Sequence, residues 1–443
     1  MINAIESRPV AILGGGIAGL TAALHLKNHR VPFVLFESSD AVAGLMKSER
    51  DDEGYTYDCG VHFLTNRLAA AIGMSKDCQP MARYGETVHL RGRCYSYPLG
   101  LLTSPKYLTS ALFAKSKSLI SSSGATARQY YSSQYGSRLA EEIAIPLTEA
   151  WSGADGDEIA SAVGQKFSTG LARMMMLRTA AKMTKRVIGI GYASTIVEST
   201  NSWHVYPRGG ISTVCQRMAD LVRGSIKLNS KVEQIRVSND RVESIVVNGE
   251  SLPVAGVIST APVHVLPRMI RGTNALDGLE KFEYRAMIFV NLKLDGPSGL
   301  TDVVTWVPER SYPFFRLSDI GMGLPWLVPK GKSQITCDIG CKVGDEHWTM
   351  SDDGLTELCL NALEKMIPGI RQRSCGSRVV RVPLAYPIFK VAYEAKRKAW
   401  EECSGVNGLL SVGRNGEFAH LLMEDVFWRT RWKVSRFLQN IGL

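Results

Sequence analysis

The sequence contains nine cysteines but no CxxC pair, which excludes a recognisable zinc ribbon or thioredoxin-type dithiol. It has no uninterrupted apolar run of the ~18 residues that a membrane-spanning helix needs. Residues 1–9 lack the basic flank and apolar stretch of a signal peptide, so we expect a cytoplasmic protein with reduced thiols. The histidines show no metal-ligand spacing, and we expect no metal site.

Acidic residues are absent from residues 87–140 and 159–197, although these stretches hold seven and six lysines or arginines. The whole chain carries a formal charge of +10, so this region supplies much of the excess. Such a local field suits an anionic small molecule or peripheral contact with an anionic lipid surface, and a solvated basic face is the alternative. We expect no nucleic-acid ligand.

Residues 171–188 mix methionines with basic residues. This pattern fits an amphipathic helix on anionic lipid or an adaptable wall of a substrate channel. A packed helix with a basic outer face explains it equally simply. The sequence leaves the role of this segment open, and it leaves the oligomeric state open as well.

The remaining composition is that of a folded protein. Apolar residues make up 45% of the 443 residues and charged residues 21%, which excludes a disordered, collagen-like or coiled-coil chain. At ~100 to 200 residues per domain, the length predicts two or three domains.

A glycine-rich turn lies close to the N-terminus. Residues 9–13 are typical of a short buried strand, and an apolar helical pattern begins at Leu20. Between them, Gly14 permits a tight turn, Gly16 lets the backbone approach a pyrophosphate, and Gly19 lets the helix pack close to the strand. The first N–H groups of the helix would bind phosphate. The predicted cofactor contacts in this turn are Gly14, Gly15, Gly16, Ile17, Ala18 and Gly19.

A second predicted strand, residues 31–36, ends in Glu37, 18 residues beyond Gly19. A carboxylate at this position would hydrogen-bond both hydroxyls of an adenosine ribose. Free ribose hydroxyls occur in FAD and NAD, whereas NADP carries a 2′-phosphate. The pattern therefore favours FAD or NAD.

The segment Ser38-Ser-Asp-Ala-Val-Ala-Gly44-Leu45 resembles the stretch that follows the ribose acid in FAD-dependent amine oxidases, protoporphyrinogen oxidases and UDP-galactopyranose mutases. The resemblance implies FAD and cofactor contacts from Ser38, Gly44 and Leu45. Ala43 departs from the family's usual glycine, which has a cost if the backbone there needs positive φ. No Ser-Gly-Gly-Cys-Tyr type attachment site is present, so the implied FAD is non-covalent.

Further segments resemble the same superfamily in the expected order. The stretch from Asp58 to Phe63 is similar to the "D-x-G-x-H-x-F" stretch that approaches the flavin ring, which implies a contact from His62. Tyr206-Pro-Arg-Gly-Gly210 is similar to the "YPxGG" element, and a helix is predicted from Ile211 to Val222. Residues 231–235 and 254–262 resemble the return to the cofactor domain, where the family's valine, here Val232, contacts adenine through its backbone.

Residues 408–425 resemble the closing segment of the galactopyranose mutase-like branch, in which a helix N-terminus faces the flavin pyrimidine. The implied contacts are Gly413, Met423 and Glu424. Glu424 stands where the family has aspartate, and His420 stands where it has an aromatic residue.

The resemblance names no certain catalytic residue; its two candidates are His62 and Arg414. Arg414 matches an arginine that lies near the substrate diphosphate in the mutases, which makes a phosphorylated substrate conceivable. The lysine that orders a water near flavin N5 in amine oxidases has no counterpart here, which disfavours amine oxidation. The substrate is a small molecule, and the basic stretches favour an anionic one.

We therefore predict an α/β protein with a discontinuous Rossmann-type FAD-binding domain and an inserted α+β substrate domain of mixed sheet and helix. The FAD-binding domain is expected over residues 1–75, 204–270 and 400–443, and the substrate domain, with a basic helical insert, over 76–203 and 271–399. Helices are predicted at about 105–119 and within 125–149, and strands at 286–294, 301–307 and 333–342.

Three functions are compatible with these features. The first is an FAD-dependent oxidase, dehydrogenase or desaturase that moves a hydride from a substrate carbon to flavin N5. The second is a redox-neutral sugar mutase like UDP-galactopyranose mutase, in which reduced flavin attacks an anomeric carbon. The third is a non-catalytic flavin-binding protein that docks on a membrane or a partner. The sequence favours the first and does not reveal the electron acceptor.

Overall fold

The computed structural model describes residues 8–97, 99–118, 124–166, 186–189 and 201–443, together with three single positions, Met176, Thr179 and Met183. The methionine-rich segment 171–188 therefore lies largely outside the described residues. In the described part of the chain, no helix combines the length and the apolar character needed to cross a membrane.

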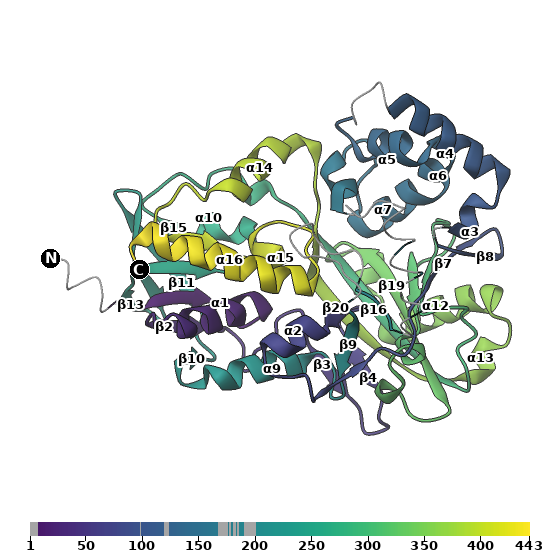
Figure 1. Cartoon of the computed structure of the whole chain (residues 1–443), viewed down its shortest axis with the longest axis horizontal. Coiled ribbons are helices and arrows are strands. Elements are labelled where there is room, and N and C mark those ends of the chain that lie inside the picture. Colours follow the sequence, from purple (N-terminus) through teal and green to yellow (C-terminus); the bar gives the residue numbers. More distant parts are fainter. Residues whose placement is uncertain are drawn as a thin grey trace.

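A five-stranded parallel sheet forms one end of the molecule (Figure 1). All residues of its central strands are buried, because both faces of the sheet are covered. Helices cover one face, and a smaller antiparallel sheet covers the other. In spatial order the strands are β10 (Ile226–Lys227), β2 (Phe33–Phe36), β1 (Val10–Leu13), β14 (Gly256–Ser259) and β21 (Leu409–Ser411).

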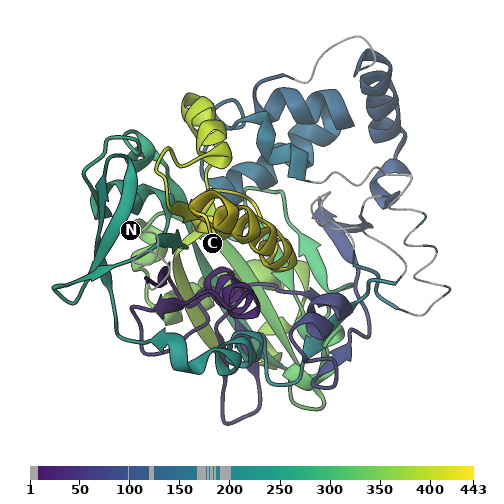
Figure 2. The ribbon, with the colours of Figure 1, turned by 60° about the vertical axis from the view of Figure 1, so that its left-hand side comes forward.

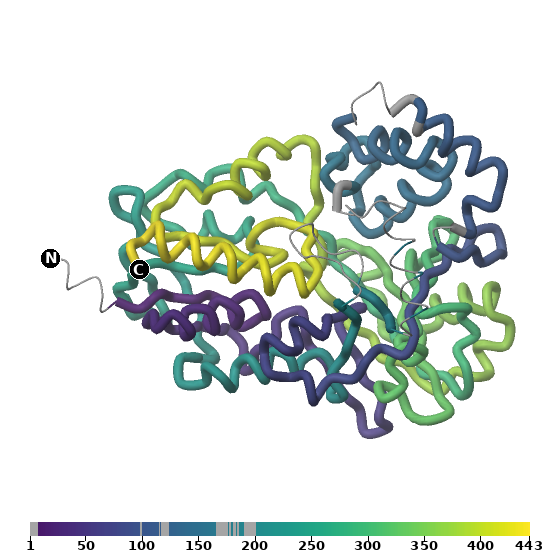
Figure 3. The backbone as a smooth tube through the Cα atoms, viewed as in Figure 1, coloured from purple at the N-terminus to yellow at the C-terminus, as the bar shows by residue number. Residues whose placement is uncertain are grey.

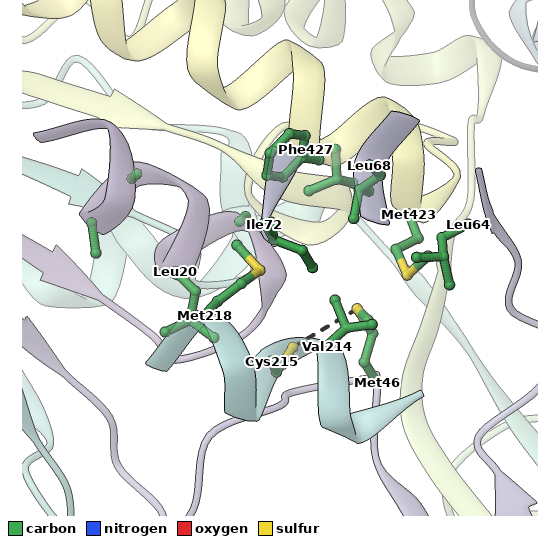
Figure 4. Close-up of a cluster of buried hydrophobic side chains, with 14 of the residues drawn as sticks. Leu20, Met46, Leu64, Leu68, Ile72, Val214, Cys215, Met218, Met423 and Phe427 are labelled. Carbon is green, nitrogen blue, oxygen red and sulfur yellow. Dashed lines mark hydrogen bonds between the residues drawn. The ribbon is translucent and has the colours of Figure 1, made fainter. Parts of the chain in front are cut away.

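Three helices pack on one face of the parallel sheet: α1 (Ile17–Asn28), α9 (Ser212–Leu221) and α16 (Met423–Ile441). Figure 4 shows Leu20 of α1, Met218 of α9 and Phe427 of α16 in one apolar cluster. The Sγ of Cys215 lies 3.9 Å from the Sδ of Met46 in the same cluster. Segments from the beginning, middle and end of the chain therefore share one core.

The smaller antiparallel sheet has the strand order β13-β12-β11-β15. Asn239 and Asp240 join β11 to β12 with φ of 51° and 55°, the left-handed geometry that two-residue hairpins require and that asparagine and aspartate tolerate. Ile235 and Val242 turn toward the parallel sheet and are buried there. The strands are β11 (Val232–Ser238), β12 (Arg241–Val247), β13 (Glu250–Pro253) and β15 (Ile270–Arg271).

A seven-stranded sheet occupies the other end of the molecule (Figure 1). Alternation along β16 places Ile288 and Leu292 on a face that α12 (Asp352–Met366) covers. Met287 and Phe289 lie on the opposite face, which packs against residues 45 and 59 from the other end of the molecule. In spatial order the strands are β20 (Ser374–Pro387), β16 (Tyr284–Asp295), β19 (Lys332–Cys341), β18 (Arg316–Ser318), β17 (Val304–Trp306), β7 (Glu86–Leu90) and β8 (Arg93–Ser96).

A layer of helices lies beside this sheet (Figure 2). It contains α4 (Pro105–Ser118), which begins with a proline in its first turn as predicted. The further helix predicted within 125–149 is divided, because Gly136, with φ of 86°, ends the first part. The divided parts are α5 (Ala127–Tyr135), α6 (Ser137–Leu139), one π-helical turn (Ala140–Ala144) and α7 (Ile145–Ser152).

The chain passes between the two ends of the molecule several times, which Figure 3 shows as purple, blue, teal, green and yellow in turn. The first described residues and the C-terminus lie at the end that holds the parallel sheet (Figure 3). The remaining elements are β3 (Ser48–Arg50), β4 (Thr56–Asp58), β5 (Leu64–Thr65), β6 (Cys78–Pro80), β9 (His204–Pro207), α2 (Asn66–Ala71), α3 (Leu99–Leu102), α10 (Leu266–Met269), α11 (Glu346–Thr349), α13 (Ile370–Arg373), α14 (Glu394–Glu402) and α15 (Gly413–Gly416).

The predicted α/β class is confirmed, and the predicted elements are close to the observed ones. The strand predicted at 31–36 begins two residues later, after Pro32, and the helix predicted at 211–222 is shorter by one residue at each end. The strands predicted at 286–294, 301–307 and 333–342 are β16, β17 and β19. Long, strongly periodic segments were the easiest to place.

Buried His204 makes the stability of the fold dependent on pH. It lies on β9 against Phe63 and Tyr84, and burial lowers its pKa from 6.5 to about 4. Between those values the unfolded chain binds a proton that the folded protein does not, so stability falls as the pH falls from 6.5 to 4. We expect His204→Gln to remove roughly 2.4 kcal/mol of this loss, measured from urea unfolding at pH 7 and pH 4.5. His347→Gln, at a position that is not buried, should leave the loss unchanged.

Candidate cofactor and substrate site

The turn between β1 and α1, residues 14–19, forms a glycine-lined loop, which we call the cradle. Its backbone geometry leaves no room for a side chain at Gly14 or Gly19. Gly14 has φ of +102°, and a Cβ there would lie 2.1 Å from the Oγ1 of Thr260. A Cβ on Gly19 would lie 1.9 Å from the carbonyl oxygen of Gly14. The helix starts after Gly16 without any side-chain cap, so the N–H groups of the predicted residues Ile17 and Ala18 remain available to an anion.

Glu37 stands at the end of β2, beside this cradle. Its carboxylate accepts hydrogen bonds from the Gly15 N–H at 2.6 Å and from the Ser39 N–H and Oγ at 2.9 and 2.7 Å. Burial acts to raise the pKa of Glu37, but these hydrogen bonds outweigh it and the pKa is lowered. Glu37 is therefore ionised at neutral pH. The lone pairs of its carboxylate that are not already used can accept hydrogen bonds from ribose hydroxyls.

Two more predicted contacts lie next to Glu37. The Ser38 hydroxyl is 3.3 Å from the Glu37 carboxylate and is exposed. The Ser230 N–H donates to the Glu37 carbonyl at 2.8 Å, which brings Val232, at the start of β11, to the same edge of the sheet. The structure thus gathers the expected adenosine-binding residues from two distant segments.

Ala43, which stands where the family usually has glycine, does have a positive φ. Its φ is 143°, it is 3% exposed, and it forms a bridge with Gly16 across the cradle. Gly44 follows with φ of +56°, and a Cβ on it would lie 3.2 Å from the Gly16 Cα. The alanine is therefore held in a backbone conformation that glycine adopts more easily.

We expect Ala43→Gly to raise the free energy of unfolding slightly, by about 0.2 kcal/mol. Relief of the strain is worth about 1–3 kcal/mol, against about 1 kcal/mol for the flexibility of glycine and about 0.8 kcal/mol for the lost methyl. Ala22→Gly, a buried alanine inside α1, should instead lower stability by more than about 1 kcal/mol. Urea unfolding of both variants checks the opposite signs; two losses of similar size would contradict the strain at Ala43.

The closing segment of the chain comes back to the same cradle. A Cβ on Gly413 would lie 2.8 Å from the Cβ of Ala18, so β21 and α15 lie directly beside the start of α1. Met423 begins α16 and is buried in the core between the helices. The Leu422 N–H is capped by Asp425 at 3.1 Å.

Glu424 uses its side chain within the protein. Its carboxylate accepts from the Thr65 N–H and hydroxyl at 2.9 and 2.8 Å and from the Trp428 indole at 2.8 Å. Burial raises its pKa, and these donors oppose the rise. Any contact of this position with a cofactor therefore falls to the backbone, while the side chain fastens β5 to α16.

His62 lies between the cradle and the seven-stranded sheet. Its Nδ1 is 3.2 Å from the carbonyl oxygen of Gly60, which assigns the ring proton to Nδ1 and leaves Nε2 as an acceptor. Burial, followed by the charges of Arg414 and Arg316, lowers the pKa of His62 to about 4. The imidazole is therefore neutral at pH 7 and a weak base.

Arg414 carries a positive charge next to His62. Its Nε and Nη2 donate to the carbonyl oxygen of Leu421 at 3.0 and 2.9 Å, and its guanidinium lies 5.4 Å from the centre of the Tyr386 ring. Burial lowers its pKa, but an arginine stays protonated in proteins. Among the described residues no carboxylate forms an ion pair with it.

Arg285, on β16 of the seven-stranded sheet, is a second partly buried arginine. It lies opposite Tyr386 in the pairing of β16 with β20, and Gly153 leaves room for its guanidinium, because a Cβ there would lie 2.4 Å from Nη1. Its buried Nε has no hydrogen-bond partner within the described residues, and burial lowers its pKa. Arg414 thus lies near the Tyr386 ring, and Arg285 lies beside Tyr386 through the strand pairing. Neither arginine has an ion-pair partner among the described residues, although the charges of Asp425 and Asp345 act on Arg414 and Arg285 respectively.

Arg316 and Asp338 form a buried ion pair that the sequence did not reveal. They are cross-strand partners on β18 and β19, and the Arg316 Nη2 donates to Asp338 Oδ2. Burial raises the pKa of Asp338 against the opposing charge of Arg316. The pair lies beside Phe289, whose ring packs close to Gly60 in the His62 loop. The sequence does contain a signal for a buried charge here, because an aspartate interrupts the otherwise apolar and hydroxylic run Ile335-Thr-Cys-Asp-Ile339.

Aromatic side chains and Leu45 complete the surroundings of these charges. His420, which stands where an aromatic was expected, packs with ring centres 4.6 Å from Trp151 and 4.9 Å from Phe389. It therefore takes the place of an aromatic in this cluster. Leu45 packs against the same face of the seven-stranded sheet as Phe289.

The residues fit a bound flavin dinucleotide. Glycines at closely packed positions, an uncapped helix start and an ionised glutamate lie together on the parallel sheet. His62 lies close enough to Arg414 to feel its charge, and Leu45 packs on the face of the seven-stranded sheet that carries Phe289. The site combines a nucleotide-binding half with a cationic, aromatic half.

Comparison with known proteins agrees with this site. Residues 17–413 match the model of the flavin containing amine oxidoreductase family, and the chain belongs to that family. Its cofactor is therefore a flavin, and the expected FAD is confirmed.

The similar proteins are porphyrinogen oxidases and flavoenzymes of known structure. Coproporphyrinogen III oxidase of Bacillus subtilis is 21% identical over 92% of this chain and 93% of its own length. A solved UDP-galactopyranose mutase is 18% identical, with a TM-score of 0.78 over 98% of this chain and 96% of its own. A putative protoporphyrinogen oxidase from Exiguobacterium is 15% identical, with a TM-score of 0.72 over 99% of both chains. These likenesses confirm the Rossmann-type fold with a substrate domain and support an oxidoreductase.

Proposed function

We propose that the protein is an FAD-dependent oxidoreductase that removes a hydride from a carbon of an anionic small molecule. The observation that carries the proposal is the burial of two arginines near Tyr386, Arg414 close to its ring and Arg285 opposite it in the strand pairing. Neither has an ion-pair partner in the described residues, and Asp425 and Asp345 offset their charges only in part. Buried cations of this kind are costly unless a ligand supplies the counter-charge. Carboxylate or phosphate groups of a substrate would do so.

The bound flavin would supply the two-electron chemistry. The chain's own residues bind and orient: the cradle holds the dinucleotide, the arginines hold the anionic end of the substrate, and the Trp151 cluster excludes water from it. His62 is neutral, so it offers a hydrogen-bond acceptor at Nε2 and no positive charge. Neutral His62 is too weak a base to take a proton from the substrate at pH 7.

An anaerobic titration tests the reaction. The oxidised protein should lose its flavin absorbance when its own substrate is added, and coproporphyrinogen III, named for the Bacillus relative, is the first compound to try. A panel of carboxylated and phosphorylated compounds follows. A protein that leaves the flavin oxidised with all of them, yet converts UDP-galactopyranose after dithionite reduction, would be a mutase instead.

Glu37→Ala tests the assignment of the nucleotide half. Loss of hydrogen bonds to an ionised carboxylate should weaken FAD binding by about 10- to 100-fold. Fluorescence titration of the apoprotein with FAD measures the change. Asp40→Ala, an exposed acid three residues away, is the matched control and should bind FAD normally. Equal affinities for the two variants would remove Glu37 from the site.

A further inference from the structure

Helix α4 presents apolar side chains to solvent. Leu108, Leu112 and Phe113 are 42%, 62% and 65% exposed, whereas Tyr107 and Ala114 on the opposite side are buried. Leu108 and Leu112, four residues apart, lie on one helix face, and Phe113 lies at the edge of that face. Isolated exposed leucines are common, but a contiguous apolar face usually marks a contact with another surface.

The surroundings of this face are basic. Residues 87–140 contain no acid, and within them Arg93 and Arg138 are exposed without an ion pair in the described part of the chain. Arg138 lies next to α4, since its N–H donates to the Ser110 hydroxyl. Lys106 and Arg91 share one carboxylate, that of Glu142. The charge around α4 therefore stays positive.

The place of α4 in the fold leaves this face accessible. It lies in the outer part of the helical layer, away from the parallel sheet (Figures 1 and 2). Helix α4 contacts α3, α5 and α6, and its buried Tyr107 packs against Val88, Leu101 and Ile143. The face therefore does not belong to the cofactor site.

We propose that this face of α4 docks the protein on an anionic lipid surface. A uniformly negative surface complements the exposed Arg93 and Arg138 of the acid-free stretch 87–140. The neighbouring Glu142 is already paired with two basic side chains. A protein partner, in contrast, usually offers charges of both signs. Leucine and phenylalanine side chains enter the boundary between headgroups and acyl chains, and the basic residues remain among the headgroups. The proposal does not depend on the reaction that the flavin carries out.

Vesicle sedimentation of the flavin-loaded protein tests the proposal. Vesicles of phosphatidylcholine with about 30% phosphatidylserine should bind the protein, and pure phosphatidylcholine vesicles should bind it at least tenfold more weakly. About 0.5 M NaCl should weaken binding to the anionic vesicles by roughly tenfold, because it screens the basic residues.

Paired variants separate the apolar from the charged contribution. Leu108→Gln with Leu112→Gln should reduce binding by at least about tenfold, and glutamine keeps the helix propensity of leucine. Leu228→Gln changes a leucine of similar exposure at the other end of the molecule and should bind like the wild type. Arg93→Gln with Arg138→Gln should weaken binding to anionic vesicles only. Flavin absorbance and melting temperature check that each variant folds.

Three outcomes would overturn the proposal. The first is a wild-type protein that sediments with neither vesicle. The second is an equal loss for the Leu228→Gln control. The third is a dimer, seen by analytical ultracentrifugation, that the leucine pair dissolves while vesicle binding stays absent, which would assign the face to contact between two copies of the chain.

Discussion

Gly19→Ala is expected to abolish flavin binding and to lower the free energy of unfolding by about 3 kcal/mol. The added Cβ would lie 1.9 Å from the carbonyl oxygen of Gly14, which is backbone and cannot rotate away. Helix α1 would have to move off β1, and the N–H groups that form the cradle would move with it. The flavin absorbance of the purified protein and its urea unfolding curve measure the two effects.

Gly224→Ala is the matched control. Gly224 lies in a short 3₁₀ turn, its φ is not positive, and a Cβ on it would meet nothing within 4 Å. This variant should keep its flavin and should be at least as stable as the wild type, because alanine restricts the unfolded chain. A Gly19→Ala protein that is as yellow and as stable as Gly224→Ala would show that the helix does not approach the strand this closely.

Arg414→Met is expected to raise the KM for the anionic substrate by about 10- to 100-fold, the usual worth of a charge-assisted hydrogen bond. The effect on kcat should be smaller, because an arginine that holds the anionic end of the substrate binds the ground state and the transition state alike. Arg414→Lys should lie between the two, since lysine keeps the charge but loses the planar fork. Steady-state kinetics and an FAD titration together separate substrate binding from cofactor binding.

Arg310→Met provides the control for charge alone. The Arg310 side chain is 73% exposed and pairs with Glu149 at the surface. Its removal changes the net charge by the same amount without touching the aromatic cluster, so KM should stay within about twofold. If both variants raise KM equally, general electrostatic attraction, rather than Arg414, accounts for the preference for anions.

Local patterns predicted the strand, the glycine turn and the helix near the N-terminus. The run from Pro9 to Gly19 contains a strand, a turn and a helix start within eleven residues, so its geometry is set by neighbours in the sequence. The cost of alanine at position 43 also followed from a local rule about positive φ, and its φ is 143°. Such features need little information about the rest of the fold.

The substrate half depends on contacts between distant segments, which no local pattern records. Arg316 meets Asp338 only because β18 and β19 pair in one register, and Arg285 meets Tyr386 through the pairing of β16 with β20. Glu424 shows the same limit: its carboxylate binds Thr65, 359 residues away, although the motif suggested a contact with the cofactor. Sequence reasoning identified the chemistry of these residue types more easily than their partners.

The parallel sheet imposes an order of events on the synthesis of the protein. Its edge strand β21 and the covering helix α16 are made about 400 residues after β1, which at about 5–20 residues per second is a delay of roughly 20–80 s on the ribosome. During this time the glycine turn has already been synthesised, but Gly413 and the start of α16, which pack beside it, have not. Flavin capture must therefore be a late step, and a nascent chain without its last strand depends on chaperones or on rapid completion to keep the apolar face of α1 out of solvent.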